Sequence, residues 1–325
     1  MAEVPERNEA AAEGTVRVEA PARLHFGFLD LHGGLGRRFG SIGLAIDEPS
    51  LALTVRRSAR LAVEGPEAER VRGYAEAAAA HLGRDADVAI AVERVIPAHA
   101  GFGSGTQLGL AVAAAMARLN GTPFAVESFA ATLDRGNRSG VGLCAFTEGG
   151  LIVDGGRGPD GGPPPVIARL PYPDAWRIVL IIDPDRAGVH GVREVEAFRD
   201  LPRFPEAQAA EICRITLMQV LPAAALAEPQ GFGAGITRIQ DLIGDHFAPH
   251  QGGRYASAAV AQVLASVAAQ GVPGYGQSSW GPTGFVLMPS EAEARALVAD
   301  LDRGGPLRFV IARGRNGGAS VTGPA

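Results

Sequence analysis

Apolar residues recur along the chain with two periods, which predict an alternation of strands and helices. Alternating apolar and polar positions predict strands at 15–28, where Pro21 should break the run, and at 51–63. Short apolar runs predict further strands at 88–96, 151–153, 178–182, 285–288 and 308–312. Helices are predicted at 73–82, 108–119, 127–133, 206–221, 257–269 and 291–301. The pattern favours an α+β protein, with the later helices packed on one face of a sheet.

Chain length and local composition predict how these elements are divided. A chain of 325 residues usually forms two domains. The stretch 155–165 is almost entirely Gly, Pro and Asp, which indicates a connector or domain boundary. We expect domains at 15–170 and 171–313 and a tail at 314–325. The Ala- and Glu-rich residues 1–14 lack the features of a signal peptide and are predicted to be a disordered leader.

Three glycine-rich polar segments interrupt the pattern. The first, 97–107, follows a predicted strand and enters a predicted helix, so its backbone amides and the helix start would form an anion cradle. The alternative is a glycine-rich turn that merely ends a strand. The others are 135–142, which carries arginines, and 274–284. We expect the three to line a cleft between two domains.

The segment 23–43 is a fourth candidate. It holds two histidines, three arginines and six glycines, which favours a binding loop over a solvated hairpin.

Composition excludes several functions. The net charge of −5 gives no reason to expect nucleic acid, and no apolar run approaches the roughly 20 residues that span a bilayer. The sequence contains no lysine, which excludes a Walker-type phosphate loop and Schiff-base chemistry. Cys144 and Cys213 are too few for a disulfide framework and are predicted to be reduced core residues of a cytoplasmic protein.

Three weaker signals lie in the second half. The acids Asp183 and Asp185 follow a strand, as in phosphoribosyltransferases, but Pro184 separates them, which disfavours that fold. Asp241 and Asp245 could be a metal pair, although a solvated helix face is favoured because no third ligand shares that face. The remaining signal is a polar cluster before a predicted helix, formed by His190, Arg193 and Glu194.

Motifs in three places resemble the GHMP kinase superfamily: Pro21-Ala22-Arg23, the Pro-x-x-x-Gly-x-Gly-Ser loop at 97–104, and the glycine-rich loop at 274–284. Within that superfamily, longer strings at 23–31, 37–44, 138–142, 149–156 and 276–283 resemble the β-ribofuranosylaminobenzene 5′-phosphate synthase family. The resemblance implies a two-domain fold, with an N-terminal domain like domain 2 of ribosomal protein S5 and a ferredoxin-like C-terminal domain. It also implies a cytoplasmic homodimer acting in tetrahydromethanopterin biosynthesis.

The chain departs from the kinases beside Ser139-Gly140. Kinases commonly carry an acid shortly after this pair as the base for the acceptor hydroxyl, whereas Val141 and Gly142 follow here. The resemblance instead implies that 5-phosphoribosyl 1-pyrophosphate condenses with 4-aminobenzoate, releasing CO₂ and pyrophosphate. The sequence alone leaves 4-hydroxybenzoate open as the acceptor. Mg²⁺ would be needed, but no organic cofactor. An ATP-dependent small-molecule kinase is the alternative, and a catalytically silent binding protein is a third class.

These expectations assign roles to individual residues. Pyrophosphate is predicted to bind at Gly101, Gly103, Ser104, Gly105, Thr106 and Gln107, and Mg²⁺ at Ser104 or Thr106 with Glu148. The 5-phosphate and the benzoate carboxylate are assigned to Arg23, Arg37, Arg38 and Arg138, with Ser139 beside them. His25 would donate to a departing oxygen or orient the aromatic amine, unless it is simply a satisfied hairpin histidine. The aromatic side of the site would be closed by Gln277, Ser278, Ser279 and Trp280, with Trp280 either stacking on the ring or packing in the core.

Overall fold

A long antiparallel hairpin is the central element of the first half of the molecule. The computed structural model describes residues 14–188 and 191–324, and its hairpin joins β1 (Thr15–Asp30) to β2 (Phe39–Arg57). The segment 23–43 therefore consists mostly of hairpin strands, so the predicted loop conformation is wrong, whereas a role of the segment in binding stays a prediction. The hairpin belongs to a seven-stranded sheet whose other members are β3 (Ala62–Glu64), β4 (Val88–Arg94), β5 (Leu151–Asp154), β6 (Val166–Leu170) and β11 (Ser320–Thr322).

Pro21 does not break β1, contrary to the prediction. Pro21 lies opposite Ser50, but the next residue, Ala22, lies opposite Ile46, so the register shifts at the proline. The extra residues on β2 form a bulge at the point where proline has no N–H to give to the ladder. The strand continues beyond it to Asp30 and carries Arg23 and His25 into the centre of the molecule.

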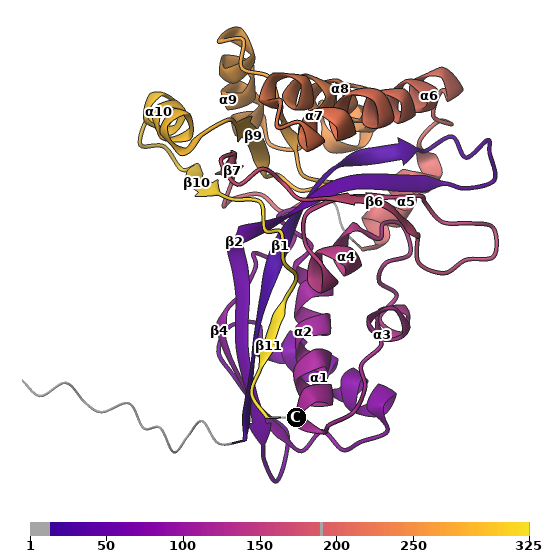
Figure 1. Ribbon diagram of the computed structural model, residues 1–325, viewed down its shortest axis with the longest axis vertical. Helices are drawn as coiled ribbons and strands as arrows, with labels where there is room; N and C mark the ends of the chain where they lie inside the picture. Colours follow the sequence, from indigo (N-terminus) through magenta and orange to yellow (C-terminus); the bar gives the residue numbers. More distant parts are fainter. Residues whose placement is uncertain (1–13, 189–190, 325) are drawn as a thin grey trace, which may run out of the picture.

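Four helices accompany this sheet: α1 (Ala68–Leu82), α2 (Ser104–Leu119), α3 (Val126–Thr132) and α4 (Val141–Thr147). Figure 1 shows α1 and α2 alongside β1, β2 and β4 in the lower half of the molecule. The sequence did not predict α4, because its first residues were assigned to a glycine-rich loop. Val141, Cys144 and Ala145 on this helix are buried against Ala45 and Ile152. Burial of Cys144 is confirmed, whereas Cys213 is exposed and its predicted core position is wrong.

A second, four-stranded antiparallel sheet has the order β10-β7-β9-β8. Its strands are β7 (Arg177–Ile182), β8 (Tyr275–Gln277), β9 (Gly284–Met288) and β10 (Arg308–Ala312). One face packs on α9 (Ala258–Ala269) and α10 (Glu291–Leu301). Leu180 and Phe285 on the other face join the main core, which also contains Phe232 and Ile236 of α8 (Pro229–Gln251). The prediction of helices on one face only is therefore wrong.

Helix α8 was not predicted, because glycines and Pro249 interrupt its helical pattern. One of these glycines has a packing reason: a Cβ at Gly233 would lie 3.0 Å from the backbone nitrogen of Gly274. The helix can therefore approach the third glycine-rich segment closely. Three further helical segments precede it near the β1–β2 hairpin, and these are α5 (Val192–Asp200), α6 (Glu206–Ile215) with the π-helical turn Thr216–Val220, and α7 (Leu221–Ala225).

The connections differ from the expected boundaries. Residues 155–165 join β5 to β6 within one sheet, so this stretch is a hairpin loop and not a boundary between domains. The segment 314–325, expected to be a tail, contributes β11, which pairs with β1. Most of the predicted leader and His190 lie outside the described residues, as do the side chains of Arg193 and Glu194. Within 14–188 and 191–324, no helix is both long enough and apolar enough to cross a membrane.

Candidate functional site

A cavity of about 360 Å³ lies where β1, the first turn of α2 and residues 134–143 meet. Its charged lining is strongly unbalanced: among the described residues, Asp134 is the one carboxylate, against four arginines. Guanidinium groups pair with phosphate and carboxylate oxygens in two-point contacts, and a cavity of one sign attracts ligands of the other. The site is therefore suited to a multiply charged anion. The four arginines are Arg23, Arg135, Arg138 and Arg157.

The first turn of α2 lies beside the cavity and contributes Thr106 to its lining. Gly103 takes a left-handed conformation (φ 77°), and a Cβ there would lie 3.0 Å from Nε of Arg23. At Gly105, a Cβ would lie 2.7 Å from Nη2 of Arg70 and 3.3 Å from Nη2 of Arg135. The glycines thus allow arginines to lie directly against the helix start, where backbone N–H groups lack intrahelical partners.

The residues of the predicted pyrophosphate cradle do not all face the cavity, because some of them make hydrogen bonds within the protein instead. Thr106 is the member of that set that lines the cavity. The carbonyl of Gly101 accepts hydrogen bonds from Arg23 and from the hydroxyl of Ser278, so it belongs to the framework. Gln107 is fully buried and donates from Nε2 to the carbonyl of Gly142 at 2.8 Å, which joins α2 to α4. Ser104 is also buried.

The third glycine-rich segment contacts the first one and β1. The Ser278 hydroxyl donates to the Gly101 carbonyl at 2.7 Å and accepts from the backbone N–H of His25 at 3.1 Å. Ser279 lines the cavity, and its N–H donates to the His25 carbonyl at 3.1 Å. Gln277 donates to the Ser279 carbonyl at 3.0 Å. Buried contacts of one serine hydroxyl therefore connect three segments that are far apart in the sequence.

His25 is buried beside the cavity that it lines. Its Nε2 has no hydrogen-bond partner among the described residues, and its ring contacts the edge of Phe28 at a centroid distance of 4.7 Å. Burial, with the nearby Arg23 guanidinium, lowers the pKa of His25 from 6.5 to about 3. The imidazole is therefore neutral at pH 7, with one nitrogen able to serve a bound molecule. His25 is therefore not a histidine whose ring nitrogens are both hydrogen-bonded within the hairpin.

Trp280 is a core residue. It is 3% exposed, and its ring lies 4.2 Å from that of Phe247, tilted by 34°. Of the two roles predicted for this residue, the structure supports packing.

Ser139 lines the cavity and is fixed from behind by Asp154, which is fully buried. Asp154 accepts from the Ser139 hydroxyl at 3.3 Å and from the backbone N–H groups of Gly140 and Gly156 at 2.9 and 3.0 Å. Burial raises the pKa of Asp154 to about 6, although these hydrogen bonds oppose the shift. A carboxylate so enclosed orients the loop and is not placed to take a proton from a substrate.

Three predicted site residues lie elsewhere. Arg37 donates to the carbonyls of Gly155 and Gly156, both at 2.8 Å. Arg38 stacks on the ring of Phe39 at 5.3 Å and lines a neighbouring cavity. Glu148 follows the last residue of α4 and pairs with Arg169 at 3.6 Å, outside the arginine-lined cavity. The structure therefore does not join Glu148 to Thr106 in a metal site.

The acids of α8 also form no metal site. Asp241 and Asp245 are both bound by Arg254, in the second case at 2.7 Å. Across the described part of the chain, no group of three His, Cys, Asp or Glu side chains is placed to hold a metal ion.

Comparison with known proteins identifies the family and the fold. The profile for the N-terminal domain of GHMP kinases matches residues 69–150. A solved structure of a putative homoserine kinase from Listeria monocytogenes is 18% identical with a TM-score of 0.65, covering 94% of this chain and 99% of that one. The β-ribofuranosylphenol 5′-phosphate synthase of Methanothermobacter thermautotrophicus is 32% identical over 93% of this chain and 97% of its own length. The chain belongs to this synthase family.

A second member of the synthase family, from Archaeoglobus fulgidus, is 33% identical over 94% of this chain and 99% of its own. Membership confirms the family and the GHMP kinase fold that the motifs indicated, and it makes the chain an enzyme of the synthase kind. The solved structure shares the fold of this chain at an identity too low to transfer an activity.

Four polar or charged side chains that line the cavity of this synthase family member were not assigned from the sequence: Asp134, Arg135, Asn137 and Arg157. Three of them belong to the second glycine-rich segment or directly precede it, so that signal could have found them. Arg157 lies in the 155–165 hairpin loop, and its backbone pairs with that of Arg38. No local feature of the sequence predicts that pairing.

Proposed function

We propose that the chain condenses 5-phosphoribosyl 1-pyrophosphate with 4-aminobenzoate and releases pyrophosphate and CO₂. The observation that carries the proposal is the cavity lined by four arginines and a single carboxylate. The donor substrate bears phosphate at both ends of its ribose, and its charge matches this lining. Such a reaction makes the chain a decarboxylating pentosyltransferase.

The chemistry requires stabilisation of a leaving group. The bond from C1 of the ribose to the pyrophosphate oxygen breaks with its electron pair on pyrophosphate, leaving positive charge on the sugar. The ring carbon that bears the carboxylate then forms the new bond to C1. Loss of CO₂ returns an electron pair to the ring and restores its aromaticity. Arg23, Arg138 and the first turn of α2 would stabilise the developing charge of the pyrophosphate.

The oxygen atoms of the cavity fit Mg²⁺ if the phosphates of the substrate supply some of its ligands. Mg²⁺ usually keeps several waters and binds one or two carboxylates together with substrate phosphates. The cavity offers the carboxylate of Asp134 and the hydroxyl of Thr106, which would hold the ion in place of the predicted Glu148. Bound there, Mg²⁺ would neutralise the departing pyrophosphate.

The neutral imidazole of His25 would form a hydrogen bond with the aromatic acid, which accepts the ribose. Its unpartnered Nε2 can donate to the substrate carboxylate or accept from the ring substituent, depending on the tautomer. The relatives are named for a phenol product, which supports 4-hydroxybenzoate as the alternative acceptor. His25 and Ser279 are the uncharged polar groups in this part of the cavity that would discriminate an amine from a hydroxyl.

A small-molecule kinase is the second candidate, because Asp134 lines the cavity and the fold is that of kinases. Against it, Val141 and Gly142 replace the acid expected after Ser139-Gly140. Asp154, which approaches that loop, is buried and engaged by it.

The remaining assignments rest on the family resemblance. We place the reaction in tetrahydromethanopterin biosynthesis, carried out in the cytoplasm by a homodimer with small-molecule substrates.

One assay tests the proposal. The purified protein is incubated with 5-phosphoribosyl 1-pyrophosphate, Mg²⁺ and either aromatic acid labelled at the carboxyl, and labelled CO₂ is measured. Release with 4-aminobenzoate, in an amount equal to the pyrophosphate formed, supports the proposal. Release with 4-hydroxybenzoate alone would change the acceptor. No release with either acid, together with ATP-dependent phosphorylation of an alcohol, would establish the kinase instead.

A further inference from the structure

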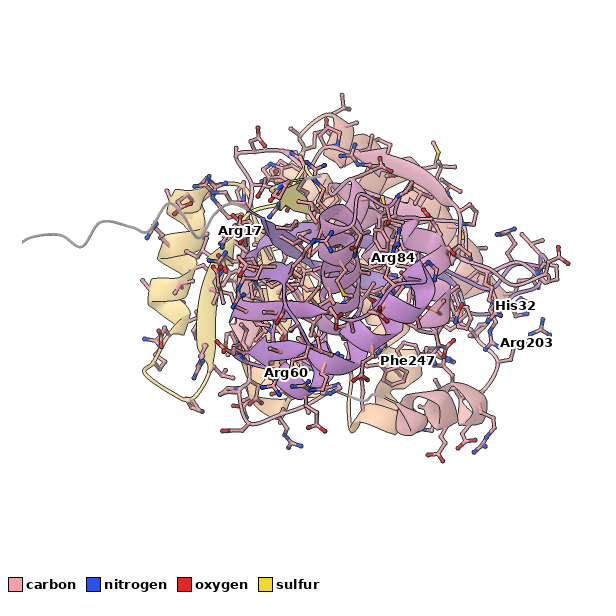
Figure 2. All side chains as sticks on the ribbon, turned by 90° about the horizontal axis from the view of Figure 1, so that it is seen from below. Arg17, His32, Arg60, Arg84, Arg203 and Phe247 are labelled. Carbon is pink, nitrogen blue, oxygen red and sulfur yellow. The ribbon has the colours of Figure 1, made fainter. Side chains whose placement is uncertain are left out.

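A second cationic cavity, of about 450 Å³, adjoins the proposed active site. It lies between the turn of the β1–β2 hairpin, the segment 198–204 and α8. In Figure 2 His32 and Arg203, which both line it, project at the same edge of the molecule. Its polar lining consists of His32, Arg38, Arg199, Arg203 and His246, and no carboxylate is among the described residues that line it.

Two aromatic rings separate this cavity from the first. The rings of Phe39 and Phe198 meet at right angles, with centroids 5.8 Å apart. Phe39 lines the first cavity and Phe198 the second. An arginine stacks on each ring, Arg38 on Phe39 at 5.3 Å and Arg138 on Phe198 at 4.9 Å. The two cavities are therefore neighbours with a shared wall, and each has its own arginines.

Among the described residues, the charge of the second cavity is only partly neutralised. Arg199 pairs with Asp200 at 2.9 Å, which leaves two arginines to consider. Neither Arg38 nor Arg203 makes an ion pair with any described residue. Single exposed arginines of this kind are ordinary on a surface. Here they converge on a cavity whose floor includes the buried ring of Phe204.

We propose that this cavity is a second oxyanion site, which binds a phosphate-bearing anion such as pyrophosphate. Two guanidinium groups provide the paired donors that phosphate oxygens accept, and two imidazoles add further donors. Arg38, assigned from the sequence to the substrate, belongs to this second site. The inference takes pyrophosphate from the proposed function, but it concerns binding alone and needs no turnover.

Calorimetric titration of the full-length protein with inorganic pyrophosphate tests the site. The wild type should bind two equivalents per chain. Arg203→Ala should weaken one of them at least tenfold and leave the other unchanged, since it removes one of the guanidinium groups that pair with the phosphate oxygens. Arg203→Lys should weaken the same equivalent less than Arg203→Ala does, because lysine keeps the charge but not the paired donors. Arg60→Ala, at an exposed arginine of the β2–β3 loop, is the matched control and should bind like the wild type.

Three results would overturn the inference: a single equivalent in the wild type, two unchanged equivalents in Arg203→Ala, or loss of 4-aminobenzoate binding but not pyrophosphate binding in that variant. Thermal unfolding checks that Arg203→Ala is folded, which is expected for an exposed residue without an ion pair. The proposed function is tested separately, by the release of labelled CO₂. If no labelled CO₂ is released, the two equivalents of bound pyrophosphate would still be expected.

Discussion

Asp154 accepts a hydrogen bond from the backbone N–H of Gly140 at 2.9 Å, across a sequence separation of 14 residues. Its other oxygen accepts from the N–H of Gly156 at 3.0 Å. The carbonyl of Gly156 in turn accepts from Arg37. One buried carboxylate therefore fixes the loop that places Ser139 in the cavity and the loop that anchors Arg37.

The stability contributed by Asp154 should depend on pH. Burial raises the pKa of Asp154 from 3.8 to about 6 in the folded state, so the folded protein binds the proton more tightly than the unfolded chain. This contribution is complete below pH 3.8 and is lost as pH rises through 6. It amounts to at most about 3 kcal/mol, because one pKa unit corresponds to about 1.4 kcal/mol.

Asp154→Asn isolates that effect, because asparagine does not titrate. The free energy of unfolding, measured by urea denaturation between pH 4 and pH 7, should fall with pH more steeply in the wild type than in the variant. The variant should be less stable overall, since its amide has one oxygen for the N–H groups of Gly140 and Gly156. Parallel curves for the two proteins would contradict the buried titration.

Gly101→Ala should destabilise the protein more than Gly36→Ala. Both glycines have a positive φ, of 90° and 86°, so each substitution carries a backbone strain of about 1–2 kcal/mol. A Cβ at Gly101 would also lie 2.3 Å from the carbonyl oxygen of Ser278, whereas a Cβ at Gly36 meets nothing within 4 Å. The clash should cost about 2 kcal/mol more, read from chemical denaturation. Equal losses would show that the contact between the two glycine-rich segments is not tight.

Arg138→Ala should weaken the handling of 5-phosphoribosyl 1-pyrophosphate by well over tenfold. Arg138 lines the first cavity, and arginine forms charge-assisted pairs with desolvated phosphate or carboxylate. The measurement is kcat/KM for labelled CO₂ release. Arg84→Ala, at an exposed arginine just after α1, is the control and should leave the rate unchanged. An Arg138→Ala enzyme with the wild-type rate would remove this arginine from the site.

His25 should remain neutral through the physiological range. Its pKa is lowered to about 3, so its ¹⁵N ring shifts, followed by NMR, should not titrate between pH 5 and pH 8. The unfolded chain binds this proton near pH 6.5, so stability due to the neutral imidazole is present above 6.5 and is lost as pH falls toward 3. A midpoint near 6.5 in the folded protein would mean that the ring is solvated.

The sequence by itself determined the local elements and the family. Alternation and apolar runs located strands such as β5, β7 and β10, because burial of one or both faces of a sheet leaves a direct mark on residue order. The spacing of glycines and polar residues also indicated three segments that meet at one site. The long strings around Arg23 and Ser139 were specific enough to indicate the synthase family.

Only the tertiary structure decided which of those residues face the cavity. The sequence predicted Gln107 and Ser278 as substrate ligands. In the structure Gln107 donates to the Gly142 carbonyl, and the Ser278 hydroxyl is bonded to Gly101 and His25. Arg157 reaches the cavity, and Asp154 reaches the loop behind Ser139, through pairings between strands and loops that no local pattern encodes. Helix α8 was missed for the same reason, since Gly233 opposes a helix locally and is required by close packing against Gly274. Residue type and spacing determine what a side chain can do, whereas the contacts made by distant segments decide which groups remain available to a ligand.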